Sequence, residues 1–300
     1  MAFVTGSSAA RDIAMRKFAG ASYHVQKMSV AMRDGATIDA RIYSPTDTPF
    51  AAVVYAHGGA FASGDCDSEE ALSLALAKMQ MAVISSSYRQ GPGFQHPKAS
   101  NDLADITLHA RSKLWPELPL GIVGSSSGGF HALMLSVEPP EDLPYAFCIA
   151  IAPVAHPGLR AAYLKACIRG VAARKGYNVV QTSLLAAEIL AMQMSYFRKE
   201  SAMNEAGDLL RAPGKHHHRP TRTLMILGSR DASVPQQVTA AVQGWATKTL
   251  VLGGYGHEIG IEPPLDTHDS YLPDIMEFAR AAAIRVSSAK PIVSASARLC

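Results

Sequence analysis

The chain has 300 residues, a length that allows one large α/β domain or two small ones. With 48% hydrophobic and 18% charged residues, it is expected to be globular and to bury a sizeable core. The net charge of +3 comes from scattered basic residues, which gives no case for a nucleic-acid partner.

Segments that would direct the chain to a membrane are not indicated. Residues 1–20 carry no apolar stretch ahead of their charges, so no signal peptide is predicted. The longest apolar run, 145–155, is too short to cross a bilayer and is typical of a buried strand. The four cysteines are far apart and form no CxxC pair, which favours a reduced, cytoplasmic protein.

The N-terminal part is predicted to form a helix and then three strands. A short amphipathic helix is expected at 9–21, followed by strands at 22–32 and 36–43 and a loop at 44–49. Residues 51–56 are almost all apolar, which is typical of a parallel strand buried on both faces.

Helices and strands then alternate. A helix is expected to run to residue 79, because its start carries acidic residues that suit the positive end of a helix dipole: Asp67, Glu69 and Glu70. A strand at 81–86 and a helix at 100–114 follow, and another strand is expected at 145–152.

From 153 to 220 this alternation stops, and only helical segments are indicated, notably 160–173 and 183–197. It resumes with a strand, a helix, a strand and a last helix, at 223–227, 236–245, 249–252 and 268–284. The order predicts an α/β fold, a mostly parallel sheet with helices on both faces. We expect the core to comprise 22–152 and 221–286, with 153–220 as a helical cap to which 1–21 contributes, and 287–300 as a loosely held tail.

The strongest motif is Gly124-Ser125-Ser126-Ser127-Gly128. It follows a short apolar run and precedes a predicted helix at 131–137, as a nucleophile elbow requires. Glycines two before and two after the central serine make room for a tight turn that exposes its hydroxyl, so the spacing selects Ser126 as the nucleophile. A glycine–serine linker is the alternative interpretation of the bare pattern.

A serine nucleophile needs a base and an acid that orients the base, and in this type of sheet the chain order is Ser, acid, His. Asp231 and His257 each follow a predicted strand, so both are expected at the sheet edge that carries Ser126. Taken alone, Asp231 fits a helix cap and His257 fits a surface loop. Rival acids are less suited, because one adjoins the histidine and two begin the last helix: Glu258, Asp266 and Asp269.

An oxyanion hole is indicated by His57-Gly58-Gly59-Ala60, which follows the buried strand at 51–56. Consecutive glycines let backbone N–H groups turn toward a ligand, and the amide after the nucleophile completes such a hole. The predicted donors are the amides of Gly58, Gly59 and Ser127. An ordinary glycine turn is the alternative.

Together these residues resemble the α/β-hydrolase fold and, within it, the hormone-sensitive-lipase-like carboxylesterases. The resemblance covers roughly residues 40 to 285 and rests on five features: the segment 57–61, Tyr88-Arg89 with His96-Pro97, the elbow with Gly129, Asp231 and His257. It implies a Ser126–His257–Asp231 triad and a cap over an acyl pocket. The chain departs from the family pattern at Ser125 and Ser127, where an acid and Ala are common, at Ala60, where a third Gly is usual, and at 90–93.

Three further residues are expected to contact the substrate: Phe61, Ser125 and His156. His156 follows the strand that ends before Pro153 and should lie near the active edge of the sheet, although a loop histidine is the alternative. The run 216–218 consists of histidines, but consecutive imidazoles cannot all face one ion, so no metal is predicted.

The sequence therefore predicts a serine hydrolase that cleaves short or medium acyl esters through an acyl-enzyme, without a cofactor. Its expected partner is a small-molecule ester rather than nucleic acid or a membrane. Because homodimers are frequent in the resembled family, the resemblance also allows a homodimer. Two alternatives remain open: an amide hydrolase, arylformamidase-like or peptidase-like, and a non-catalytic binding protein on the same fold.

Overall fold

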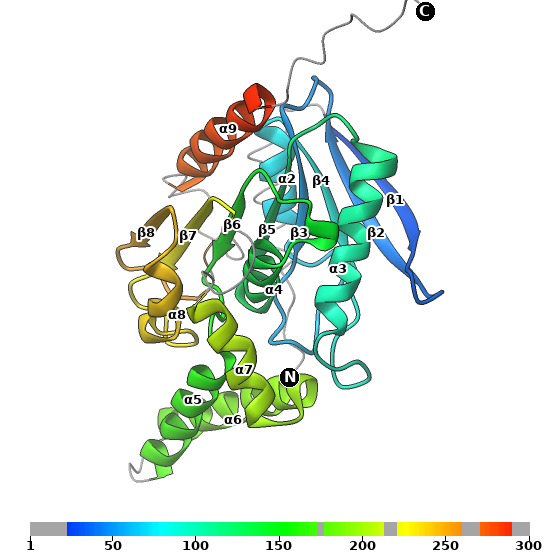
Figure 1. The fold of residues 1–300 in the computed structure, drawn as a ribbon. Coiled ribbons are helices and arrows are strands. Elements are labelled where there is room, and N and C mark those ends of the chain that lie inside the picture. The colour runs from blue at the N-terminus through cyan, green and yellow to red at the C-terminus, as the bar shows by residue number, and fades with distance from the viewer. Residues whose placement is uncertain (1–22, 173–176, 213–220, 258, 260–270, 290–300) are drawn as a thin grey trace, which may run out of the picture.

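A computed structural model describes residues 23–172, 177–212, 221–257, 259 and 271–289. Within these residues eight strands form one sheet, in the order β1-β2-β4-β3-β5-β6-β7-β8 (Figure 1). The strands are Tyr23–Ala31 (β1), Thr37–Pro45 (β2), Ala51–Ala56 (β3), Met81–Ser86 (β4), Leu120–Ser125 (β5), Cys148–Ile151 (β6), Thr223–Gly228 (β7) and Lys248–Leu252 (β8).

The sheet is parallel from β4 to β8, and β1 and β2 form an antiparallel hairpin at one edge. This confirms the predicted fold class. The register places Ala56 of β3 opposite Gly124 of β5, and Gly228 of β7 opposite Leu252 of β8. The loops that leave these strands therefore leave them at the same edge, where the predicted site residues lie.

Helices cover both faces of the sheet, and further helices lie beyond its end. They are Glu70–Lys78 (α2), Lys98–His109 (α3), Ser126–Val137 (α4), Pro157–Ala172 (α5), Tyr177–Phe197 (α6), Glu200–Arg211 (α7), Gln236–Gln243 (α8) and Leu272–Ala289 (α9), with a π-helical turn at Ala110–Leu114 and a 3₁₀ turn at Pro140–Asp142. Alternate strand residues point to opposite faces, so Val53 packs in the cluster that holds α2 and α9, whereas Val54 packs with α3 and α4.

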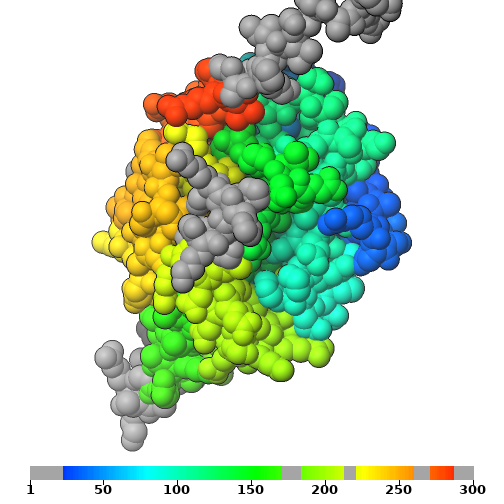
Figure 2. Space-filling model, in the orientation of Figure 1, coloured from blue at the N-terminus to red at the C-terminus, as the bar shows by residue number. Residues whose placement is uncertain are grey.

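Helices α5, α6 and α7 form a separate group beyond the end of the sheet, at the bottom of Figure 1. In the space-filling view this group, green to yellow-green, is continuous with the body of the molecule (Figure 2). Its three helices fall in the segment 153–220, where the sequence predicts helical structure without strands; the third helix, α7, was not individually predicted.

Several boundaries differ from the sequence-based expectation. The strand predicted at 145–152 is shortened to β6, and the last helix extends beyond residue 284 to Ala289. The helix predicted at 9–21, the histidines at 216–218 and most of the predicted tail lie outside the described residues. None of the helices that the structure describes is long and apolar enough to span a membrane.

Candidate active site

Ser126 occupies a strained turn between β5 and α4. Its φ of 51° lies in the left-handed region, which non-glycine residues rarely adopt. The turn is also closely packed: a Cβ on Gly124 would lie 2.3 Å from the Gly128 carbonyl oxygen, and a Cβ on Gly128 would lie 2.0 Å from that of Ala56. Only glycine fits at either position, as the predicted elbow requires.

The structure brings together the three residues that were singled out as nucleophile, base and acid. The His257 Nε2 atom lies 2.9 Å from Ser126 Oγ, and His257 Nδ1 lies 2.8 Å from Asp231 Oδ2. These distances suit a chain in which Ser126 donates to the imidazole and the imidazole donates to the carboxylate. The residues are 131 and 26 positions apart in the chain, so the parallel sheet is what joins them.

Asp231 uses its two carboxylate oxygens for different purposes. Its Oδ1 atom accepts backbone hydrogen bonds from Ser233, at 2.9 Å, and from Val234, at 2.7 Å, while Oδ2 faces His257. The carboxylate thus organises its own turn, as the capping interpretation expects, and also contacts the histidine. Its side chain is 3% exposed, so the carboxylate beside His257 is almost completely shielded from water.

Helix α5 contacts the turn that carries Asp231. Arg160 donates from Nε to the Ser233 carbonyl oxygen, at 3.1 Å, and from Nη2 to Ser233 Oγ, at 2.9 Å. Tyr163 donates its hydroxyl to the Ala232 carbonyl oxygen at 3.0 Å. Burial lowers the pKa of Arg160 to about 10. Sequence reasoning missed both side chains, because nothing local indicates that a helix 70 residues upstream packs on this turn.

His57 supports the loop that carries the predicted oxyanion donors. Its Nδ1 atom lies 2.6 Å from the Gly58 carbonyl oxygen, and its ring stacks on Tyr88 with centroids 4.3 Å apart. The Tyr88 hydroxyl donates to the His57 carbonyl oxygen. Burial lowers the pKa of His57 to about 4, so the imidazole is neutral at ordinary pH.

This loop lies directly against Ser126. A Cβ placed on Gly58 would lie 3.3 Å from Ser126 Cβ, and Gly59 has a φ of 134°, which only glycine adopts readily. Ser127 lies in the first turn of α4, where backbone N–H groups have no partner within the helix. The loop and the helix start therefore border the same space beside Ser126 Oγ.

Glu69 lies directly before α2, as predicted, but its side chain does not serve the helix. It was predicted to sit with Asp67 and Glu70 at the start of a helix, as an acid that complements the dipole. In the structure Glu69 is 7% exposed, makes no side-chain capping bond to α2, and accepts hydrogen bonds from Ser125 and Tyr55 instead. Tertiary contacts with β3 and β5, which a local pattern does not contain, override the capping preference.

The three residues expected to contact a substrate all have protein partners. Phe61 is fully buried and stacks on Tyr196, with ring centroids 5.6 Å apart. Ser125 is 1% exposed and donates to Glu69. His156 is 3% exposed; its Nδ1 atom accepts from the Leu159 amide at 3.2 Å, and its Nε2 atom lies 3.4 Å from Asp208 on α7. These contacts give each residue a packing role, and their part in binding stays a prediction.

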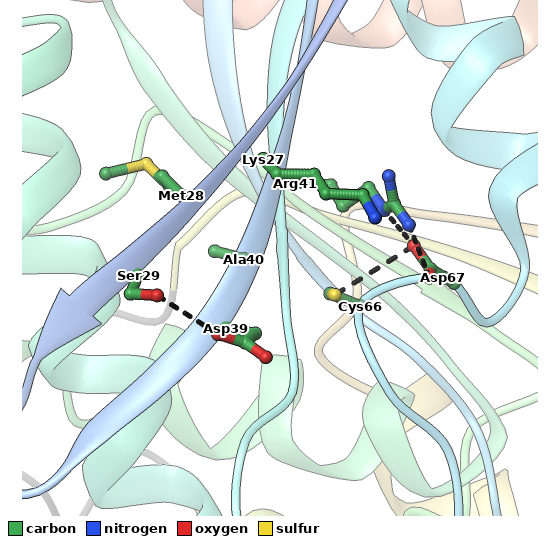
Figure 3. A pocket seen from close by; sticks show the side chains of 8 residues that line it. All are labelled: Lys27, Met28, Ser29, Asp39, Ala40, Arg41, Cys66 and Asp67. Carbon is green, nitrogen blue, oxygen red and sulfur yellow. Dashed lines mark hydrogen bonds and ion pairs between the residues drawn. The ribbon is translucent and has the colours of Figure 1, made fainter.

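A hollow of about 300 Å³ lies away from these residues, against β1 and β2 (Figure 3). Lys27, Asp39 and Arg41 are among its lining residues, with Cys66 and Asp67 from the loop before α2. Arg41 and Asp67 form an ion pair with each other. Because its charged groups include this internal pair and it holds none of the Ser126 cluster, we do not assign it a role in the chemistry.

The chain is similar to known hydrolases in sequence and in fold. A family model described as alpha/beta hydrolase fold matches residues 53–249. An ethyl acetate hydrolase from Pseudomonas putida is 34% identical over 121 residues; the match spans 37% of this chain and only 38% of that enzyme.

Solved structures of esterases share the architecture. A hyperthermophilic esterase from the archaeon Pyrobaculum calidifontis superposes with a TM-score of 0.71 at 19% identity, covering 92% of this chain and 91% of its own. A thermostable carboxylesterase cloned from a metagenomic library gives a TM-score of 0.67 at 18% identity, covering 92% and 95%. At such identities the likeness establishes the fold.

Proposed function

This chain belongs to the family of the alpha/beta hydrolase fold, and from that premise we propose that it is a serine carboxylesterase for short or medium acyl esters. The observation that carries the proposal is the hydrogen-bonded series from Ser126 Oγ through His257 to Asp231, with distances of 2.9 and 2.8 Å. A serine hydroxyl becomes a useful nucleophile when an oriented imidazole accepts its proton.

In the proposed reaction Ser126 Oγ attacks the ester carbonyl carbon while its proton passes to His257 Nε2. Asp231 fixes the tautomer that leaves Nε2 free to accept, and its charge stabilises the imidazolium. Collapse of the tetrahedral intermediate breaks the bond to the alkoxy group, which leaves as an alcohol with the proton from His257. Water then attacks the acyl-enzyme with His257 again as base, which releases the acid and restores Ser126.

The negative oxygen of the intermediate requires backbone donors. We assign this role to the three predicted amides, those of Gly58, Gly59 and Ser127. Gly58 borders Ser126, because a Cβ on Gly58 would lie 3.3 Å from Ser126 Cβ.

The α5–α7 group is proposed as the cap over the acyl pocket. It begins beside the nucleophile, because the Val154 amide donates to the Ser126 carbonyl oxygen at 3.0 Å. Ala60 of the oxyanion loop packs with residues of α5 and α6, namely Leu164, Ala186 and Ile189. A cap this close to the reacting atoms favours small acyl groups, and the name of the Pseudomonas putida relative supports the same choice.

The proposal is tested with p-nitrophenyl esters from acetyl to dodecanoyl and with an acyl p-nitroanilide. We expect hydrolysis of the short esters, a decline toward dodecanoyl and little anilide cleavage. Ser126→Ala should lower kcat/KM by at least about 10⁴-fold. The matched control is Ser112→Ala, because Ser112 is exposed and its hydroxyl donates to the Leu108 carbonyl oxygen, one helical turn earlier. Full activity of Ser126→Ala, or cleavage of the anilide alone, contradicts an ester hydrolase that uses Ser126.

A further inference from the structure

Glu69 is a buried acid next to the proposed reaction centre that the mechanism above does not use. Its φ of 58° lies in the left-handed region, although it precedes helix α2, which it does not cap with its side chain. Such a backbone conformation is costly for a non-glycine residue and persists only when the surroundings hold it in place. The strained backbone turns this side chain inward, toward β3 and β5.

The Glu69 carboxylate joins three segments that meet at the site. Ser125 Oγ, directly before the nucleophile, donates to Glu69 Oε1 at 2.7 Å. The Tyr55 hydroxyl of β3 donates to Oε2. On the third side lies the oxyanion loop, because a Cβ on Gly58 would approach Glu69 Oε1 to 2.8 Å. The two hydroxyl groups act as donors, which suits an ionised acceptor.

From these contacts we propose that Glu69 is a positioning residue of the hydrolytic site. It holds the Ser125 side of the elbow and the Gly58 side of the oxyanion loop in one fixed arrangement, and its negative charge stabilises the imidazolium formed on His257. This inference rests on the proposed function, because the arrangement matters only if Ser126 attacks a carbonyl. A small displacement of a reacting group lowers the rate of the chemical step, even when the substrate still binds equally well.

The electrostatic surroundings of Glu69 are consistent with this role. The pKa of Glu69 is raised, because burial outweighs the hydrogen bonds from Ser125 and Tyr55 and the charge of His257, which act to lower it. The titratable groups that face it are Tyr55 on β3, Tyr88 after β4 and His257 after β8.

The test is Glu69→Gln, which keeps the shape of the side chain and removes its charge. For p-nitrophenyl acetate we expect kcat to fall by about 10- to 100-fold and KM to change by less than about 3-fold. The acid limb of the kcat/KM profile should move to lower pH, because a buried negative charge no longer favours protonation of the site. The melting temperature should not fall, because burial opposes the charge that is removed.

The matched control is Glu70→Gln, which removes a charge from the first turn of the same helix and should leave kcat and the pH profile unchanged. If Glu69→Gln retains kcat within about 3-fold of the parent, or leaves the acid limb in place, the inference is overturned. If that variant does not fold, Ser125→Ala decides, since it removes one donor to Glu69. A fall in kcat at unchanged KM supports the inference, and parental kcat overturns it.

Failure of this inference can be told apart from failure of the proposed function. If the parent hydrolyses no ester and Ser126 takes up no phosphonate, the function itself is wrong. If the parent is active and Ser126→Ala is inactive while Glu69→Gln behaves as the parent, only the role of Glu69 is wrong.

Discussion

The two halves of the site are held in place by different means. Ser126 follows β5, all of whose residues are buried, and glycines pressed against neighbouring backbone fix its turn. His257 follows β8, a strand at the sheet edge without a fully buried residue, and its loop depends on polar contacts. One of these is the hydrogen bond from the Arg230 amide to the Tyr255 carbonyl oxygen, at 2.8 Å. Packing therefore positions Ser126, whereas hydrogen bonds position His257.

The difference has a practical consequence for mutation. A change on the β8 side is expected to act on chemistry with little loss of stability, since few core contacts are broken. A change on the β5 side is expected to act on both, because the same atoms that orient Ser126 also fill the core. Three experiments sharpen or break this contrast.

The largest effect is expected on the polar side, from Asp231→Asn. The backbone N–H groups of Ser233 and Val234 need an acceptor, so they will orient the amide oxygen of the new side chain toward themselves. Its NH₂ group must then face His257 Nδ1. The imidazole then carries its proton on Nε2 and cannot accept from Ser126. We expect kcat to fall by about 10⁴-fold with a melting temperature close to that of the parent, as measured by ester hydrolysis and thermal unfolding.

Asp208→Asn is the control for Asp231→Asn, because Asp208 is an exposed acid on α7 and its loss should leave kcat unchanged. A loss of activity in Asp231→Asn that is matched by unfolding would show that packing also supports the base, and the contrast would then be false.

A smaller effect is expected from Gly64→Ala, in the segment after β3 where packing holds the loop beside Ser126. Gly64 has a φ of 105°, and a Cβ there would lie 2.3 Å from His57 Nδ1. Displacing His57 displaces the oxyanion loop, so we expect a loss of about 1–3 kcal/mol of stability and about a 10-fold fall in kcat. Urea unfolding and ester hydrolysis measure the two effects. Gly93→Ala, with open space around its Cβ, is the control. Unchanged stability in Gly64→Ala would contradict the role given to packing.

The smallest effect concerns pH. Burial lowers the pKa of His57 from 6.5 to about 4, so the unfolded chain binds a proton that the folded chain rejects. Stability is therefore full above about pH 6.5 and falls as the pH drops toward 4. The contribution of His57 amounts to roughly 2 kcal/mol lost by pH 5. Glu69 acts in the opposite direction, because its raised pKa makes the folded state bind the proton more readily.

His57→Gln removes the histidine contribution to this pH dependence. Between pH 7 and pH 5, urea unfolding of the variant should lose less stability than the parent, by roughly 2 kcal/mol. His24→Gln changes an exposed residue of β1 and should lose as much stability between pH 7 and pH 5 as the parent does. If the free energy of unfolding falls equally with pH in the parent and in His57→Gln, the buried imidazole is not kept neutral by its surroundings.

Sequence reasoning reached the parts of the site whose signals are local. The glycine spacing around Ser126 follows from the sterics of one turn, and Asp231 and His257 each follow a strand whose apolar pattern is easy to recognise. The rule that parallel strands end at one edge then joins them. In the structure these three residues are joined by hydrogen bonds, from Ser126 to His257 and from His257 to Asp231.

The parts that were missed depend on contacts between remote segments. Glu69 carries the composition of a helix start, and only its partner Ser125, 56 residues away, shows why it turns inward. Arg160 meets the Asp231 turn across 73 residues. The sequence also did not indicate that Phe61 packs in an aromatic cluster with α6; its contact with a substrate stays a prediction. Periodicity records which face of an element is apolar and not which neighbour that face meets.

The central claim is that Ser126, and neither of its neighbours, is the nucleophile. The most direct test is to treat the native protein with a fluorophosphonate and locate the added mass by fragmenting the peptide that contains residues 125–127. We predict a single adduct on Ser126, formed in the parent and in Ser112→Ala and absent from Ser126→Ala. An adduct on Ser125 or Ser127, or labelling that persists in Ser126→Ala, would contradict the account.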